Sequence, residues 1–159
     1  MLLLTLFAML VLANGVPVLA HRLLDGRWSA PLDGGRPWRD GQPLFGSSKT
    51  WRGLVTGSLA CTLLAVLVGL GVGFGLVFGL LALGGDLLSS FIKRRMGLAS
   101  SARALGLDQL PEAALPMVFA VLVLPVTWLQ ALLVVAVFSG ANIVFSPWLY
   151  RLGIRRHPH

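Results

Sequence analysis

Long apolar runs separated by short charged segments divide the chain into a regular series. Residues 1–20 carry no charge, residues 53–92 carry only Asp86, and residues 113–150 carry none. A membrane-spanning helix needs about 20 predominantly apolar residues. The first run therefore predicts one helix, and each longer run predicts a helical hairpin. The expected helices cover residues 2–20, 54–70, 74–92, 113–126 and 128–149, joined by polar loops at 21–53 and 93–112.

The composition agrees with a protein that lipid covers in part. Apolar residues make up 56% of the chain and charged residues 12%, with a mean hydropathy of +0.82. Such a chain has too little polar surface for a water-soluble globule of this size. We predict an all-α integral membrane protein, one membrane-embedded domain with about five transmembrane helices. A cleaved signal peptide is the other interpretation of residues 1–20, but no positively charged segment precedes the apolar stretch.

The basic residues are confined to three segments of the chain. All thirteen lie in residues 21–52, 93–103 and 151–156. With five spans, these segments fall on one side of the membrane, and the positive-inside rule makes that side cytoplasmic. We therefore expect a multi-pass protein of the cell (inner) membrane with its amino terminus outside. The net charge of +7 could suggest nucleic acid, but this placement argues against such a partner.

A polar stripe marks the end of the third predicted helix. Asp86, Ser89, Ser90 and Lys93 follow the spacing i, i+3, i+4 and i+7, which places them on one helix face. Arg94 and Arg95 extend the positive end. An acidic residue within a span is costly unless it is paired, hydrated or bound to metal, so Asp86 is a candidate functional residue.

Further charges should meet this stripe at the same membrane face. Asp108 and Glu112 end the second loop, and Lys49 and Arg52 lie where the second helix begins. Carboxylates facing several cations suit Mg²⁺ that bridges phosphate oxygens. Two simpler interpretations stay open: the basic cluster binds lipid headgroups, and Asp86 is only an ion-pair partner of Lys93.

Other sequence signals are weaker. No Gly-x-Ser-x-Gly elbow, Walker loop or paired Cys or His metal motif is present. A cluster of glycines, Gly69, Gly71, Gly73 and Gly75, predicts a turn and close packing of helices rather than a nucleotide loop.

Four sequence blocks resemble a known family. They are ANGVP (13–17), DGQPLFGSSKTWRG (40–53), GDLLSSFIKRRMG (85–97) and LDQL (107–110). In this order, between apolar spans, they resemble CDP-archaeol synthase, a family related to the phosphatidate cytidylyltransferases. The resemblance implies a five-span enzyme that transfers CMP from CTP to a phosphorylated lipid and releases pyrophosphate in a Mg²⁺-dependent reaction.

The resemblance also implies roles for individual residues. Asp86 and Asp108 match the acids expected to hold Mg²⁺, and Lys93 joins them as a catalytic residue. Asn14, Pro17 and Gln109 match positions of lipid or structural support. The nucleotide- or phosphate-binding positions are Asp40, Lys49, Thr50, Arg52, Ser89, Ser90, Arg94 and Arg95.

The chain departs from the family pattern at one point. Where D-Q-L-D-F is expected, it has Asp108, Gln109, Leu110, Pro111 and Glu112, so the second acid is displaced by one position. Either Glu112 substitutes as a metal ligand through its longer arm, or the metal site is reorganised.

The expected partners are CTP, an archaetidic- or phosphatidic-acid-like lipid phosphate and membrane lipids. The sequence is also compatible with a homodimer. The competing hypothesis is a non-catalytic membrane protein that binds anionic lipid headgroups; a transporter is disfavoured by the absence of an internal repeat.

Overall fold

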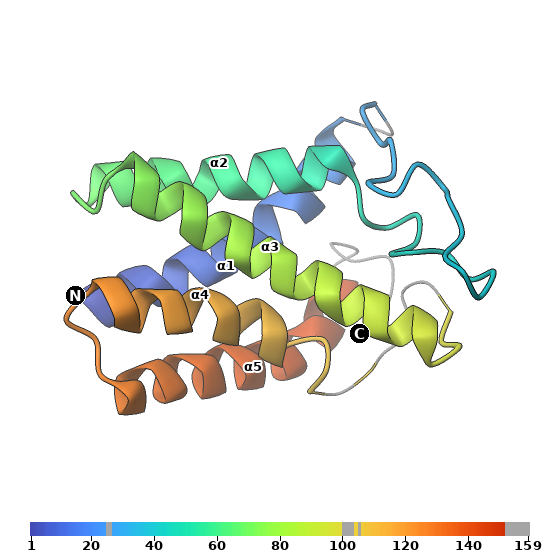
Figure 1. Cartoon of the computed structure of the whole chain (residues 1–159). Coiled ribbons are helices and arrows are strands. Elements are labelled where there is room, and N and C mark those ends of the chain that lie inside the picture. The colour runs from blue at the N-terminus through green and yellow to red at the C-terminus, as the bar shows by residue number, and fades with distance from the viewer. Residues whose placement is uncertain (25–26, 100–103, 105, 152–159) are drawn as a thin grey trace.

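In the part of the chain that the computed structural model describes, five α-helices make up the regular structure (Figure 1). The structure describes residues 1–24, 27–99, 104 and 106–151, with side chains as far as Phe145. Arg103 and the basic tail beyond Arg151 therefore lie outside the described residues. The helices are α1 (Leu2–Leu23), α2 (Trp51–Leu67), α3 (Val72–Arg95), α4 (Leu110–Val123) and α5 (Trp128–Arg151). The predicted all-α fold is confirmed.

The helices differ in how far they can reach across a bilayer. Three segments of the described chain, Leu2–Leu23, Val72–Arg95 and Trp128–Phe145, are long and apolar enough to span it. At about 1.5 Å per residue, the 17 residues of α2 and the 14 of α4 reach about 25 and 21 Å, short of the roughly 30 Å hydrocarbon core. Both helices have the lengths of the expected helices at 54–70 and 113–126, but each begins and ends three residues earlier in the chain.

The helix directions bring the polar loops to one end of the bundle. As Figure 1 shows, α1, α3 and α5 run one way and α2 and α4 run the other. The segment between α1 and α2 and the segment between α3 and α4 therefore share an end of the molecule. This is the arrangement that charge placement predicted. The short turns between α2 and α3 and between α4 and α5 lie at the opposite end.

The hairpin of α2 and α3 depends on glycine in two ways. Gly69 and Gly71 adopt positive φ values of +81° and +87° in the turn, a conformation that side chains disfavour. Gly75 lies where a Cβ would come within 2.6 Å of the Thr62 Cα, and at Gly79 a Cβ would come within 3.0 Å of the Ser58 Cα. The predicted turn and close helix packing are both observed.

A similar close contact joins α1 to α2. A Cβ on Gly57 would lie 2.7 Å from the Ala13 carbonyl oxygen and 3.2 Å from the ring of Pro17. The Asn14 side chain donates to the Leu10 carbonyl oxygen of its own helix at 3.1 Å. Asn14 and Pro17 thus lie in the packed part of α1, beside the start of α2.

Candidate functional site

The first ion pair of the site joins the first loop to α3. The Lys49 Nζ lies 2.7 and 2.6 Å from the two carboxylate oxygens of Asp86, 37 positions away in the sequence. Lys49 immediately precedes Thr50, whose side chain caps α2 by accepting from the Gly53 amide. Asp86 is therefore paired, as an acid near a membrane span should be, but its partner is Lys49 rather than Lys93.

The second ion pair joins α3 to the loop before α4. The Lys93 Nζ lies 2.5 Å from an Asp108 carboxylate oxygen, and both side chains are largely shielded from solvent. The other Asp108 oxygen accepts from the Ala104 amide, and Gln109 accepts from the Gly106 amide through its side chain. These short-range bonds fix the turn that carries Asp108.

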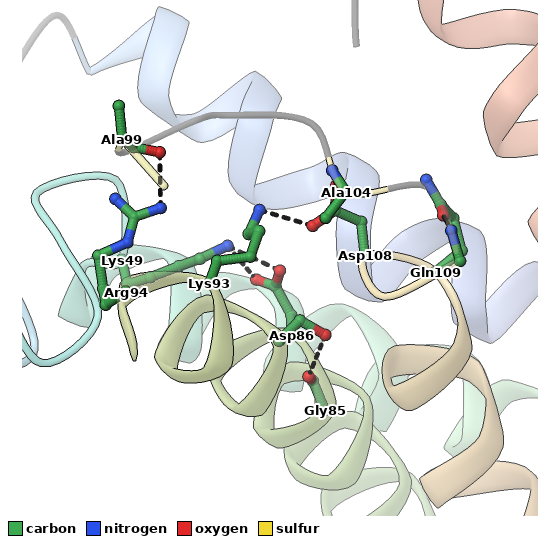
Figure 2. Close-up of polar contacts among 11 residues, drawn as sticks. Lys49, Gly85, Asp86, Lys93, Arg94, Ala99, Ala104, Asp108 and Gln109 are labelled. Atoms are coloured by element: carbon green, nitrogen blue, oxygen red, sulfur yellow. Dashed lines mark hydrogen bonds and ion pairs between the residues drawn. The ribbon is translucent and has the colours of Figure 1, made fainter. Parts of the chain in front are cut away.

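The two ion pairs are neighbours at one corner of the bundle. Figure 2 shows Lys49, Asp86, Lys93 and Asp108 pointing toward one another from three separate segments of the chain. Ser89, one turn from Asp86, donates to the Gly85 carbonyl oxygen of its own helix. Ser90 is also buried. The predicted polar stripe of α3 therefore faces the protein, and two carboxylates and two ammoniums meet at its end.

A third ion pair holds the first loop against the end of α3. Arg95 contacts Asp40 at 2.6 Å and donates to the Pro43 carbonyl oxygen at 2.7 Å. Trp38 meets Phe91 edge to face, with ring centroids 5.8 Å apart. The structure thus uses Asp40 and Arg95 to anchor the loop that leads to Lys49.

Asp33 organises the same loop, although it was not among the predicted site residues. One of its oxygens accepts from the amides of Phe45 and Gly46, at 3.0 and 3.1 Å, and the other accepts from Gly35. Burial alone would raise the pKa of Asp33, but these backbone hydrogen bonds outweigh it and the pKa is lowered. The turn pair Asp33-Gly34 was the only sequence signal that Asp33 organises the loop.

Arg94 contributes a buried cation beside this loop. It is 4% exposed and donates to the Ala99 carbonyl oxygen at 2.6 Å, while its Nε has no hydrogen-bond partner within the described part of the chain. Among the described residues no carboxylate forms an ion pair with it. Arg94 lines a pocket of about 390 Å³ between the first loop and the end of α3, together with Asp33, Gly46 and Ser47. Such a guanidinium suits an anionic or polar ligand.

Arg52 is turned away from the two ion pairs. It is 4% exposed, lies against the His21 ring nitrogen and donates to the Arg27 carbonyl oxygen. These contacts connect the start of α2 with the end of α1. Arg52 was predicted to bind phosphate, but in the structure it joins the start of α2, next to Lys49, to the end of α1.

Glu112 also points elsewhere. It is buried in the first turn of α4, and its carboxylate accepts from the Asn142 side chain of α5 at 3.2 Å. Within the described residues no group of three or more His, Cys, Asp or Glu side chains could hold a metal ion. Asp86 and Asp108 can still serve as the one or two carboxylates through which Mg²⁺ binds when substrate phosphates supply the other oxygens.

Comparisons with known proteins agree with this arrangement. A family model described as "CarS-like: CDP-archaeol synthase" matches residues 1–159. The chain belongs to the CDP-archaeol synthase family. The CDP-archaeol synthase of Thermococcus kodakarensis is 40% identical, with 92% of this chain and 88% of that protein covered. For the CDP-archaeol synthase of Thermococcus onnurineus the identity is 39%, with 92% and 89% covered.

A solved structure supports the same membership. It is described as an intramembrane enzyme for archaeal membrane lipids biosynthesis, and it matches with a TM-score of 0.72 and 29% identity. The match covers 88% of this chain and 89% of the other. The recognised family, the all-helical fold and the multi-pass membrane character are thereby confirmed for this CDP-archaeol synthase family member.

Proposed function

We propose that this CDP-archaeol synthase family member transfers the cytidylyl group of CTP to the phosphate of archaetidic acid, giving CDP-archaeol and pyrophosphate. The observation that carries the proposal is the meeting of Lys49, Asp86, Lys93 and Asp108 at one end of the bundle. These residues come from the blocks that resemble the family. A lipid phosphate and a nucleotide triphosphate are both anionic, and this cluster offers cations at the end where the polar loops gather.

The reaction is an in-line displacement at the α-phosphorus of CTP. An oxygen of the lipid phosphate forms a bond to that phosphorus, the bond to the β-phosphate breaks, and its electron pair leaves with pyrophosphate. Such chemistry depends on position and charge neutralisation more than on covalent help from the protein. The ammoniums of Lys49 and Lys93 would neutralise phosphate oxygens, and Arg94 would bind the nucleotide from the adjoining pocket.

Asp86 and Asp108 are the residues that would hold Mg²⁺. When bound, the ion would supply charge neutralisation across the phosphates of CTP. We assign Glu112 to the contact between α4 and α5 instead, because Asn142 donates to its carboxylate.

The proposed orientation puts the site on the cytoplasmic side, with the amino terminus outside. It rests on the positive-inside rule and on the loops that share one end of the bundle. CTP would then reach the site from the cytoplasm, and the lipid tails would stay in the bilayer. A homodimer stays a prediction. Light scattering tests it by measuring the mass of the detergent-solubilised protein.

Product analysis with purified protein tests the proposed reaction. The protein is incubated with labelled CTP, Mg²⁺ and either archaetidic acid or phosphatidic acid, and both pyrophosphate and the CDP-lipid are measured. We expect equal amounts of the two products with archaetidic acid. Binding of anionic vesicles without pyrophosphate release would support the non-catalytic hypothesis instead. The comparison of the two lipids decides whether ether-linked chains are required.

A further inference from the structure

Gly85 lies at the tightest approach between α3 and α4. A Cβ at this position would lie 2.2 Å from the Pro111 carbonyl oxygen, 2.4 Å from the Pro111 carbonyl carbon and 2.6 Å from the Glu112 amide nitrogen. All three atoms belong to the backbone, so no change of rotamer could relieve the overlap. Only the absence of a side chain allows α4 to begin where it does.

The neighbouring glycine provides a direct contrast. A Cβ on Gly84 would meet nothing within 4 Å. The two glycines share a helix and differ only in the face that they present. The close approach is therefore a property of position 85 and not of the glycine pair.

The contact joins two segments that each carry one acid of the site. Gly85 immediately precedes Asp86, and Pro111 follows Asp108 by three residues. The intervening turn is internally bonded, because Asp108 donates its amide to Ala104 and Leu110 donates to Gly106. A shift of Pro111 would therefore carry Asp108 with it.

We infer that Gly85 is a positioning residue: because it has no side chain, α4 packs directly against α3, and this contact sets the separation of Asp86 and Asp108. The inference rests on the proposed function. An ordinary contact begins near 3.4 Å, against the 2.2 Å that an alanine Cβ would have, so α4 would move by about 1.2 Å. Misplacement by about 1 Å can cost a reaction about 100-fold in rate, and it would strain the 2.5 Å contact of Lys93 with Asp108.

Steady-state kinetics of Gly85→Ala and Gly84→Ala test the inference. For Gly85→Ala we expect kcat to fall by about 10- to 100-fold, with KM for the lipid unchanged. Gly84→Ala should keep the kcat of the unaltered protein. Adding Asp108→Glu to Gly85→Ala should restore part of kcat, because the longer side chain reaches back across the added gap. A residue with only a packing role would not respond to that second change.

A cross-linking measurement reads the separation without catalysis. Asp86→Cys and Asp108→Cys are introduced together with Cys61→Ala, and bifunctional thiol reagents of increasing length are applied in isolated membranes. Gly85→Ala should shift the best yield to a longer reagent, whereas Gly84→Ala should not. This result stands even if the unaltered protein proves unable to turn over CTP, which would refute only the proposed function.

Several outcomes would overturn the inference. One is an identical cross-linking optimum for Gly85→Ala and Gly84→Ala. Another is a Gly85→Ala enzyme with unchanged kcat. A third is failure of Gly85→Ala to accumulate in the membrane while Gly84→Ala accumulates, which would assign Gly85 to packing alone.

Discussion

At the scale of single residues, the sequence predicted which side chains would gather but not how they would pair. Asp86, Lys93, Asp108 and Lys49 were all placed at one membrane face from charge and spacing. The alternative pairing of Asp86 with Lys93 is wrong, because Asp86 pairs with Lys49 and Lys93 pairs with Asp108. Pairing depends on the path of the two loops, which helical periodicity does not encode.

The role of Glu112 leads to a first prediction. Glu112→Gln keeps an oxygen that can accept from Asn142, so we expect kcat close to that of the unaltered enzyme. Glu112→Ala removes the carboxylate that accepts from Asn142. The variant therefore loses this hydrogen bond between α4 and α5, and its unfolding temperature should fall. Thermal unfolding and initial rates of both variants check this. A large loss of kcat in Glu112→Gln, restored by excess Mg²⁺, would instead make Glu112 a metal ligand.

Asp33 leads to a second prediction, on pH. Its pKa in the folded protein is lowered from the ordinary value of 3.8. Its contribution to stability is therefore complete above the unfolded pKa and is lost as pH falls through the folded pKa. We expect the Phe45 and Gly46 amides to exchange faster below about pH 4, once intrinsic rates are corrected. In Asp33→Asn this extra acid sensitivity of amide exchange should be absent. If Asp33→Asn shows the same pH dependence of exchange as the unaltered protein, Asp33 does not hold these amides.

At the scale of elements, apolar runs predicted the number and order of helices, and local chemistry shifted their ends. The fourth helix was expected at 113–126 but is observed at Leu110–Val123. Leu124 is extended, with φ −125° and ψ 159°, because a residue before proline, here Pro125, disfavours the helical region. Pro111 begins the helix early, since proline is favoured in a first turn.

Packing between α2 and α3 leads to a third prediction: alanine should lower the free energy of unfolding at one glycine and raise it at another. Gly75→Ala would place a Cβ 2.6 Å from the Thr62 Cα and 2.7 Å from the Ala65 Cβ, so the free energy of unfolding should fall by about 1–3 kcal/mol. Gly73→Ala meets nothing within 4 Å and should raise it by about 0.5–1 kcal/mol. Thermal or denaturant unfolding in detergent measures both. Equal effects would contradict the close packing at Gly75.

At the scale of the whole molecule, the placement of thirteen basic residues predicted that the polar loops would share one end. The structure has both loops there (Figure 1). What composition could not predict is where α2 and α4 begin and end, since each lies three residues nearer the amino terminus than expected. Hydropathy measures the length of an apolar run and does not show where a helix within it stops.

The proposed orientation leads to a fourth prediction. Cys61 is fully buried, so a membrane-impermeant maleimide should not label the unaltered protein. Ser47→Cys, in the first loop, should react only from the cytoplasmic side. Thr127→Cys, in the exposed turn between α4 and α5, should react only from outside. The reverse pattern in oriented membranes would invert the topology and place the site on the wrong side for CTP.

In the proposed function, acids and lysines distant in the sequence form one site for cytidylyl transfer. The most direct test is the initial rate of CDP-archaeol formation by the unaltered enzyme, Asp86→Asn and Arg36→Gln. Arg36 is exposed on the first loop and controls for the loss of one charge. We predict that Asp86→Asn lowers kcat by about 100- to 1000-fold while Arg36→Gln keeps it. Equal rates for all three proteins would contradict a catalytic role for this site.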